Sequence, residues 1–225
     1  MNKTSDAEAD IESLKGKAKE VYKILKKNHP KASCTLNFKN PLEIMVASML
    51  SAQCTDEKVN EVTKGLFKKY KRAKDYAEVD ISELEEDVRS TGFYRNKARA
   101  LKDSSRGLVE NHKGKVPNNM EDLVGLSGIG RKTANLVLSC AFNKPAIVVD
   151  THVYRTSRRL GLTKEKKADK IEFDLRDILP TDKWSKFSVL LISHGRETCK
   201  AKKPLCSKCP INHLCDYYAE SSPAA

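Results

Sequence analysis

One stretch of the chain combines residue types that could do chemistry on a phosphate-bearing substrate. Residues 126–130 read Leu-Ser-Gly-Ile-Gly, a pattern in which glycines permit positive φ and let a large ligand approach the backbone. The N–H groups left free by this turn and by the next helix are natural partners for a phosphate oxygen. Lys132 follows the turn, and Asp150 ends the next apolar run. We therefore expect a phosphate-binding turn with an amine and a carboxylate nearby.

Lys132 can be more than a surface cation because of its position. A positive charge at a helix N-terminus, beside Arg131 and against an apolar wall, is disfavoured, so a share of neutral amine is expected. A neutral amine is a nucleophile that forms a Schiff base with a sugar aldehyde. Asp150 can cap the helix that begins at Thr151, or it can face Lys132, accept its proton and stabilise positive charge on a sugar ring. The residues alone leave both roles open.

A nucleotide-hydrolase site is the competing interpretation of this stretch. Residues 125–133 read Gly-x-x-x-x-Gly-Arg-Lys-Thr, one residue longer than a P-loop, and residues 147–150 imitate the strand and aspartate that hold Mg²⁺. However, Arg131 shifts Lys132 out of register with the phosphate cradle. A P-loop must also follow a strand of a multi-stranded parallel sheet, which the chain's pattern does not predict. We therefore disfavour this interpretation.

Four cysteines near the C-terminus have the density of a metal site. They are spaced C-x6-C-x2-C-x5-C at Cys199, Cys206, Cys209 and Cys215. Four thiolates can hold zinc or an iron–sulfur cluster, and the single C-x2-C pair favours iron–sulfur over a zinc ribbon. The intervening loops are basic and contain no acidic residue, so we expect the site to shape a loop that contacts phosphates. Its lysines include Lys200, Lys202 and Lys203.

Composition limits the partners and the location. The chain has 42 basic and 30 acidic residues, a net charge of +12, which indicates a polyanionic partner. No apolar run is long enough for a membrane span, and the acidic N-terminus argues against a secretory or mitochondrial leader. We expect an intracellular protein, in the cytoplasm or nucleoid if prokaryotic, with a nuclear location left open. The remaining cysteines, Cys34, Cys54 and Cys140, are expected to be buried small apolar residues.

Helical periodicity dominates the chain, so we predict an all-α fold. A capping box of Ser82 and Glu85 is expected to open the fourth helix. Only residues 146–149 resemble a strand, and one strand cannot make a sheet. The predicted helices lie near residues 14–25, 42–50, 59–70, 82–88, 98–109, 120–124, 131–141, 151–160, 168–178 and 183–193.

These motifs together resemble the endonuclease III family of helix-hairpin-helix DNA glycosylases and apurinic/apyrimidinic (AP) lyases. The resemblance covers nearly the whole chain after about residue 15 and rests on the glycine turn, Lys132, the Val-Asp-Thr-His run and the four cysteines. It implies base excision repair, with removal of oxidised pyrimidines from double-stranded DNA and strand cleavage by β-elimination. It also implies a monomer. Adenine-mismatch or thymine-mismatch glycosylases are the nearest alternatives, but they generally lack the lysine.

The resemblance also implies the architecture. Residues 34–144 would form a six-helix barrel domain that carries the helix-hairpin-helix. Residues 1–33 and 145–225 would form a second helical domain that holds a [4Fe–4S] cluster. The damaged nucleotide would be flipped out of the duplex into an active-site cleft between the two domains.

Residue roles follow from the same resemblance. Lys132 would attack the sugar C1′ and Asp150 would assist, with Cys199, Cys206, Cys209 and Cys215 as cluster ligands. Gln53 would fill the gap left by the flipped nucleotide. Phe93 stands where the family commonly has a leucine as a second wedge, and an apolar ring can still insert between bases. The residues expected to contact DNA are Gln53, Phe93, Leu126, Gly128, Ile129, Gly130, Arg131, Lys200, Lys202 and Lys203.

Overall fold

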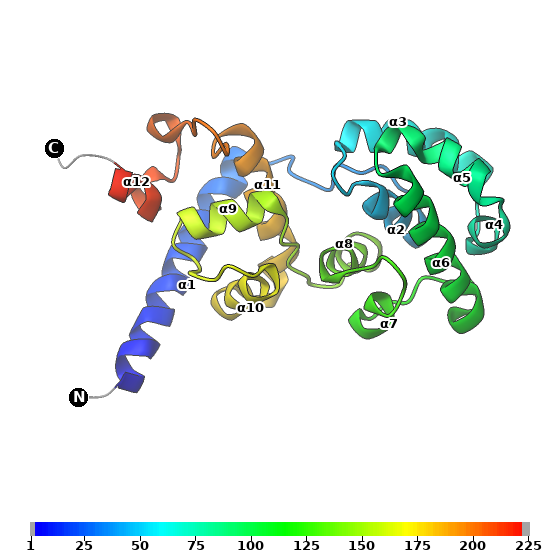
Figure 1. Cartoon of the computed structure of the whole chain (residues 1–225). Helices are drawn as coiled ribbons and strands as arrows, with labels where there is room; N and C mark the ends of the chain where they lie inside the picture. Colours follow the sequence, from blue (N-terminus) through cyan, green and yellow to red (C-terminus); the bar gives the residue numbers. More distant parts are fainter. Residues whose placement is uncertain (1–2, 222–225) are drawn as a thin grey trace. The chain divides into compact units, whose positions relative to one another are not determined.

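The computed structural model describes residues 3–221, and these residues contain helices but no β-strand (Figure 1). The all-α prediction is therefore confirmed, and a P-loop fold, which needs a parallel sheet, is excluded for this part of the chain. The α-helices are α1 (Lys3–Asn28), α2 (Pro41–Leu50), α3 (Asp56–Lys69), α4 (Ala73–Glu78), α5 (Ile81–Val88), α6 (Tyr94–His112), α7 (Met120–Val124), α8 (Arg131–Phe142), α9 (Thr151–Arg159), α10 (Ala168–Ile178), α11 (Trp184–Glu197) and α12 (Asp216–Ser221).

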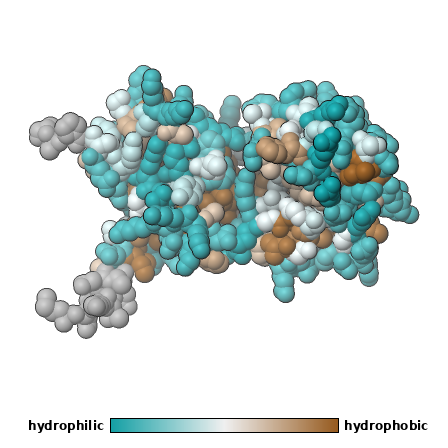
Figure 2. All heavy atoms as spheres, viewed as in Figure 1, coloured by the Kyte–Doolittle hydropathy of each residue, from teal (hydrophilic) through white to brown (hydrophobic). Residues whose placement is uncertain are grey.

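The chain divides into two compact units. Unit 1 consists of Met1–Ser33 and Pro145–Ala225, and unit 2 of Cys34–Lys144. Unit 2 holds α2 to α8, whereas unit 1 joins the first helix of the chain to α9–α12. Figure 2 shows mostly hydrophilic side chains on the face that it draws, in agreement with a chain in which 32% of residues are charged. Among the described residues, no helix is long and apolar enough to cross a membrane.

Unit 2 is built around α2, which is buried from Ile44 to Leu50. The helix begins at Pro41, and the side chain of Asn40 accepts a hydrogen bond from the Glu43 N–H to cap it. Helices α6 and α8 both pack against α2. Other fully buried side chains of this unit include Val59, Tyr76, Leu84, Leu101, Leu108, Leu123, Ala134 and Val137.

The glycine turn between α7 and α8 is fixed by packing within unit 2. Leu126 and Ile129 are only 6% and 5% exposed, so their side chains anchor the two sides of the turn. Gly128 between them has a φ of +73°. A Cβ at that position would lie 2.8 Å from the Ala100 Cβ and 3.2 Å from the Met49 Cε. Both the backbone conformation and the space therefore require glycine at position 128.

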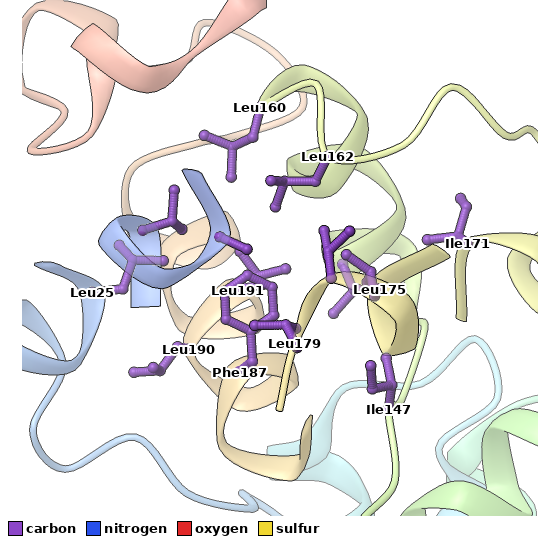
Figure 3. Close-up of a cluster of buried hydrophobic side chains, with 14 of the residues drawn as sticks. Leu25, Ile147, Leu160, Leu162, Ile171, Leu175, Leu179, Phe187, Leu190 and Leu191 are labelled. Atoms are coloured by element: carbon purple, nitrogen blue, oxygen red, sulfur yellow. The ribbon is translucent and has the colours of Figure 1, made fainter. Parts of the chain in front are cut away.

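Unit 1 has its own apolar core, drawn in Figure 3. Leu25 of α1, Leu175 of α10 and Phe187 of α11 meet there with Ile147. Residues 146–149 are buried, but they form no strand, so the strand prediction is wrong. Hydroxyl groups of α11 replace a partner strand: Ser185 and Ser188 accept hydrogen bonds from the N–H groups of Ala146 and Val148.

The helix boundaries differ from the predictions at several places. Helix α5 is capped by Asp80, whose side chain accepts the Ser82 N–H, so the predicted capping box is wrong. Asp80 is better placed because it directly precedes the first helical residue. The short helices α4 and α12 were not predicted, since six residues carry too little periodicity.

We predict that Gly128→Ala destabilises the protein by about 2 kcal/mol, because it combines a left-handed alanine with a steric contact. Gly130→Ala is the matched control, since Gly130 has a φ of −90° and a Cβ added there would meet nothing within 4 Å. Thermal unfolding followed by circular dichroism measures both. Equal unfolding midpoints for the two variants would contradict this description of the turn.

Candidate functional site

The N-terminus of α8 is presented as an open backbone site. Gly130 is the N-cap residue, and its carbonyl accepts the first helical hydrogen bond from the Ala134 N–H. The N–H groups of Lys132 and Thr133 precede that bond, so they have no partner inside the helix. Because the open space beside Gly130 admits a ligand close to the backbone, this end of α8 suits an anion such as a phosphate.

Lys132 is the second residue of α8, and its side chain is exposed. The prediction that Lys132 lies against an apolar wall is therefore wrong for unit 2, the unit to which Lys132 belongs. The reason is the register of the helix: Ala134, Val137 and Leu138 face the core of unit 2, and Lys132 does not share their face. The exposed amine can consequently extend toward a ligand held at the helix N-terminus.

Asp150 belongs to unit 1 and caps α9. Its Oδ1 accepts hydrogen bonds from the N–H groups of His152 (2.9 Å) and Val153 (2.8 Å), which confirms the capping role. Its Oδ2 accepts no hydrogen bond from the residues that the structure describes. One carboxylate oxygen therefore holds the helix, while the other is available for a substrate or a proton.

Residues that follow Asp150 connect α9 to the first cysteine of the cluster motif. Arg155 donates from Nε to the Cys199 carbonyl (3.0 Å) and from Nη2 to the Gly195 carbonyl (2.9 Å). Burial lowers the pKa of His152 in spite of the neighbouring Asp150, so this imidazole is neutral at pH 7. Arg155 could not be singled out from the sequence, since its carbonyl partners lie far away along the chain.

The four cysteines of the C-terminal motif interact electrostatically with one another. Burial and repulsion by the other three thiolates raise the pKa of Cys209 to about 11, and burial likewise raises that of Cys215. Four such thiols become thiolates together only when a cationic group neutralises them. Among the described residues, no three His, Cys, Asp or Glu side chains converge as a single metal ion requires. The chemistry of the donor set, four cysteine thiols, suits either zinc or an iron–sulfur cluster.

Two side chains outside the motif contact the cysteine sulfurs. Arg159 donates to Cys199 Sγ (3.4 Å) and to the carbonyls of Lys200 (2.8 Å) and Ala201 (3.2 Å). His194 Nε2 lies 3.6 Å from Cys209 Sγ. Burial and the nearby His29 lower the pKa of His194 to about 4, so a neutral imidazole can donate its N–H to the sulfur. These donors were missed because nothing in their spacing links them to the cysteines.

The first loop of the cysteine motif presents its basic side chains to solvent. Lys200, Lys202 and Lys203 are all exposed, as is Lys208 in the next loop. Lys203 has a φ of +50°, a left-handed conformation that reverses the chain between the first two cysteines. Because Arg159 holds the carbonyls at the start of this loop, the three lysines project from a fixed backbone.

Gln53 and Phe93 share an uncommon conformation. Both have positive φ, 51° and 48°, and both are exposed, Phe93 at 61%. A non-glycine residue in this region costs free energy and is concentrated at functional sites. Lys97, which is only 6% exposed, donates to the Thr91 carbonyl (2.7 Å) and so holds the turn that presents Phe93. An exposed aromatic ring on a braced turn is suited to stacking against a base.

Comparisons with protein families agree with these features. Residues 46–181 match the model of the HhH-GPD superfamily of base excision DNA repair proteins. Residues 199–215 match the iron–sulfur binding domain of endonuclease III. The second match spans the four cysteines and the basic loop, and it supports a [4Fe–4S] cluster as the group that they hold.

Similar proteins and solved structures indicate the same family. The chain is 49% identical to endonuclease III of Synechocystis sp. over 90% of this chain and 93% of that protein, and 37% identical to the Escherichia coli protein over 90% and 96%. A solved non-covalent endonuclease III–DNA complex has a TM-score of 0.88 at 44% identity, covering 92% of this chain and 97% of that one. The chain therefore belongs to the endonuclease III family of helix-hairpin-helix base excision repair proteins, which are DNA glycosylases and AP lyases.

Proposed function

We propose that this glycosylase and AP lyase removes oxidised pyrimidines from double-stranded DNA, cleaves the strand at the resulting site and works as a monomer. The observation that carries the proposal is the exposed amine of Lys132 beside the open N-terminus of α8. A phosphate bound to the backbone amides there would position the damaged strand without reading its sequence. A nucleotide that is flipped out of the duplex would then bring its sugar to the amine.

Lys132 would act as the nucleophile. Its nitrogen forms a bond to the sugar C1′ as the bond from C1′ to the base breaks and the base leaves with its electron pair. Opening of the sugar ring gives a Schiff base, which withdraws electrons and makes a C2′ proton acidic. Loss of that proton and departure of the 3′ phosphate cleave the strand, and water then releases Lys132.

Asp150 would assist through the carboxylate oxygen that does not cap α9. It would accept the proton that Lys132 loses or stabilise the positive charge that develops on the sugar ring. The cap matters for this role, since the two hydrogen bonds to Oδ1 fix the orientation of the carboxyl group. One side chain would thus serve both the helix and the reaction.

Gln53 and Phe93 would occupy the space that the flipped nucleotide leaves. Their positive φ values and exposed side chains support this role, because a residue that enters the stack must protrude from the surface. Phe93 is bulkier and flatter than the leucine common at this place in the family. We therefore expect the base opposite the lesion to be selected partly by stacking on this ring.

Leu126 and Ile129 are buried, so contacts between this turn and DNA would come from backbone groups of Gly128, Gly130 and Arg131. The [4Fe–4S] cluster would be held by Cys199, Cys206, Cys209 and Cys215, and it supplies the positive charge that keeps four thiolates together. Lys200, Lys202 and Lys203 would contact phosphates from the loop that this group and Arg159 hold.

A mismatch-specific glycosylase is the second candidate. A solved thermostable thymine-DNA glycosylase is 25% identical with a TM-score of 0.83, so the fold alone does not separate the two activities. Lys132 favours strand cleavage, because an enzyme that only removes a base needs no amine nucleophile.

We predict that Lys132→Gln abolishes strand cleavage and borohydride trapping on a duplex that contains thymine glycol, because the nucleophile is removed. Binding to an abasic-site duplex should stay within about threefold, since only one of many positive charges is lost. Lys64→Gln, at another exposed lysine, is the matched control and should cleave normally. Borohydride trapping that persists in Lys132→Gln would contradict the assignment of Lys132 as the nucleophile.

We predict that Asp150→Asn lowers the rate of base removal at least about 100-fold while the unfolding midpoint is maintained, because asparagine caps helices as well as aspartate does. Asp150→Ala should lose both the activity and about 1 kcal/mol of stability. Single-turnover kinetics and thermal unfolding separate the two effects. Normal base removal by Asp150→Asn would leave Asp150 with a capping role only.

We predict that replacing Lys200, Lys202 and Lys203 together by alanine weakens DNA binding and reduces the slope of log affinity against log salt by about 2 to 3. The matched control removes three exposed lysines from α1 and the segment after it, Lys23, Lys27 and Lys31. Fluorescence anisotropy at several salt concentrations measures both. An equal loss of slope in the two variants would show that the cluster loop has no special contact with DNA.

A further inference from the structure

A cavity in unit 1 is lined by none of the residues placed in the repair reaction or in contact with DNA. It measures about 450 Å³ and is formed by α1, the C-terminal end of α10 and the short 3-10 helix Thr181–Lys183. Its lining includes Ile178 and Leu179, which are only 5% and 6% exposed. The Trp184 Nε1–H donates to the Leu179 carbonyl (3.0 Å) and so fixes this apolar wall. A cavity of this size and lining can hold a large apolar group.

Tyr22 of α1 forms an aromatic wall of the same cavity. Its half-buried ring stacks on Phe187 of the unit 1 core, with ring centroids 6.4 Å apart. Lys183 Nζ lies 5.7 Å from the centre of the Tyr22 ring. The Tyr22 hydroxyl makes no hydrogen bond with any residue that the structure describes. An apolar group that enters the cavity would therefore meet a fixed ring, a cation and an open hydrogen-bonding group.

Three lysines line the cavity together with these apolar groups. Lys15 and Lys19 are one turn apart on α1, and Lys183 ends the 3-10 helix. Lys19 makes no ion pair within the described part of the chain. Lys15 is paired with Glu12 (3.4 Å) and Lys183 with Asp182 (2.6 Å), and both carboxylates are exposed to solvent. Exposed pairs of this kind contribute little, so all three amines are available to an anionic ligand.

We propose that this cavity is the docking site for an acidic peptide segment of a partner protein, with one aromatic side chain of the peptide in the cavity and its carboxylates on the three lysines. The lysines come from two separate elements, so they suit several carboxylates spaced along a chain better than one compact anion. A buried aromatic anchor is also the usual centre of a protein-binding site.

A DNA backbone fits this cavity less well than a peptide does. Contacts with phosphates need exposed cations but no apolar interior. The carboxylate of Asp177 also lines the cavity and makes no ion pair with the residues described. This carboxylate would repel a phosphate, whereas it can accept a hydrogen bond from a peptide N–H.

The first test measures the anisotropy of a fluorescein-labelled peptide, Asp-Asp-Glu-Phe-Asp-Asp, mixed with the holoprotein at low salt. We expect saturable binding with a dissociation constant on the order of 100 μM or tighter. The same peptide with alanine in place of phenylalanine should bind at least about tenfold more weakly, because the apolar anchor is lost. The label is on the peptide because Cys34, Cys54 and Cys140 are half-buried and open to a thiol-directed dye, so the prediction that they are buried is wrong.

Two matched pairs of substitutions on α1 test the place of binding. Lys15→Glu with Lys19→Glu reverses two charges of the cavity, and Lys23→Glu with Lys27→Glu reverses two exposed charges outside it. Each pair removes one bridge to a glutamate three residues earlier, so the effect on the helix is matched. We expect the first pair to weaken peptide binding at least about tenfold and the second less than about threefold.

A photo-crosslink on the wild-type protein gives the position of the peptide even if a variant fails to fold. A peptide with benzoylphenylalanine in place of phenylalanine should attach within residues 15–22 or 177–183. Attachment elsewhere, no saturable binding, equal binding of the phenylalanine and alanine peptides, or equal weakening by the two pairs of substitutions would overturn the proposal. An undamaged DNA duplex is measured with the same variants, and a clearly greater loss of DNA affinity in Lys15→Glu with Lys19→Glu would assign these lysines to DNA and overturn it as well.

Discussion

The close approach of Gly128 to α2 and α6 is the constraint on which the exposed N-terminus of α8 depends. The turn can pass over Ala100 and Met49 only with a left-handed residue that has no Cβ. Leu126 and Ile129 then enter the core on either side, and the next residue starts α8. The backbone amides and Lys132 are consequently exposed by the same packing that makes the turn rigid. Preorganisation of this kind lowers the cost of binding a phosphate and orienting a sugar.

In unit 1, polar side chains hold the cysteine-bearing loop, which has few apolar side chains of its own. Arg155 and Arg159 of α9 bind carbonyls on both sides of Cys199, and His194 of α11 reaches Cys209. Helix α9 therefore has two tasks, since its N-terminus orients Asp150 and its later turns hold the cluster loop. We therefore expect a change in the cluster loop to alter the orientation of Asp150 through this helix.

Much of this organisation could be predicted from the sequence, because it depends on residues that are close together along the chain. The apolar spacing of residues 168–178 gives α10 its observed bounds, and the cysteine spacing indicates the cluster. Features that depend on distant residues could not be predicted. The serine hydroxyls that replace a partner strand for residues 146–149 and the hydrogen bonds from Arg159 to the carbonyls of Lys200 and Ala201 both join segments far apart in sequence.

Identification of the residue that becomes bonded to DNA tests the central claim most directly. An abasic-site duplex is mixed with the wild-type protein and borohydride, the trapped complex is digested, and the peptide that carries the reduced sugar is sequenced by mass spectrometry. We expect one attachment site, the Nζ of Lys132. Attachment to another lysine or to the terminal amine, with Lys132 unmodified, would contradict the assignment of the nucleophile.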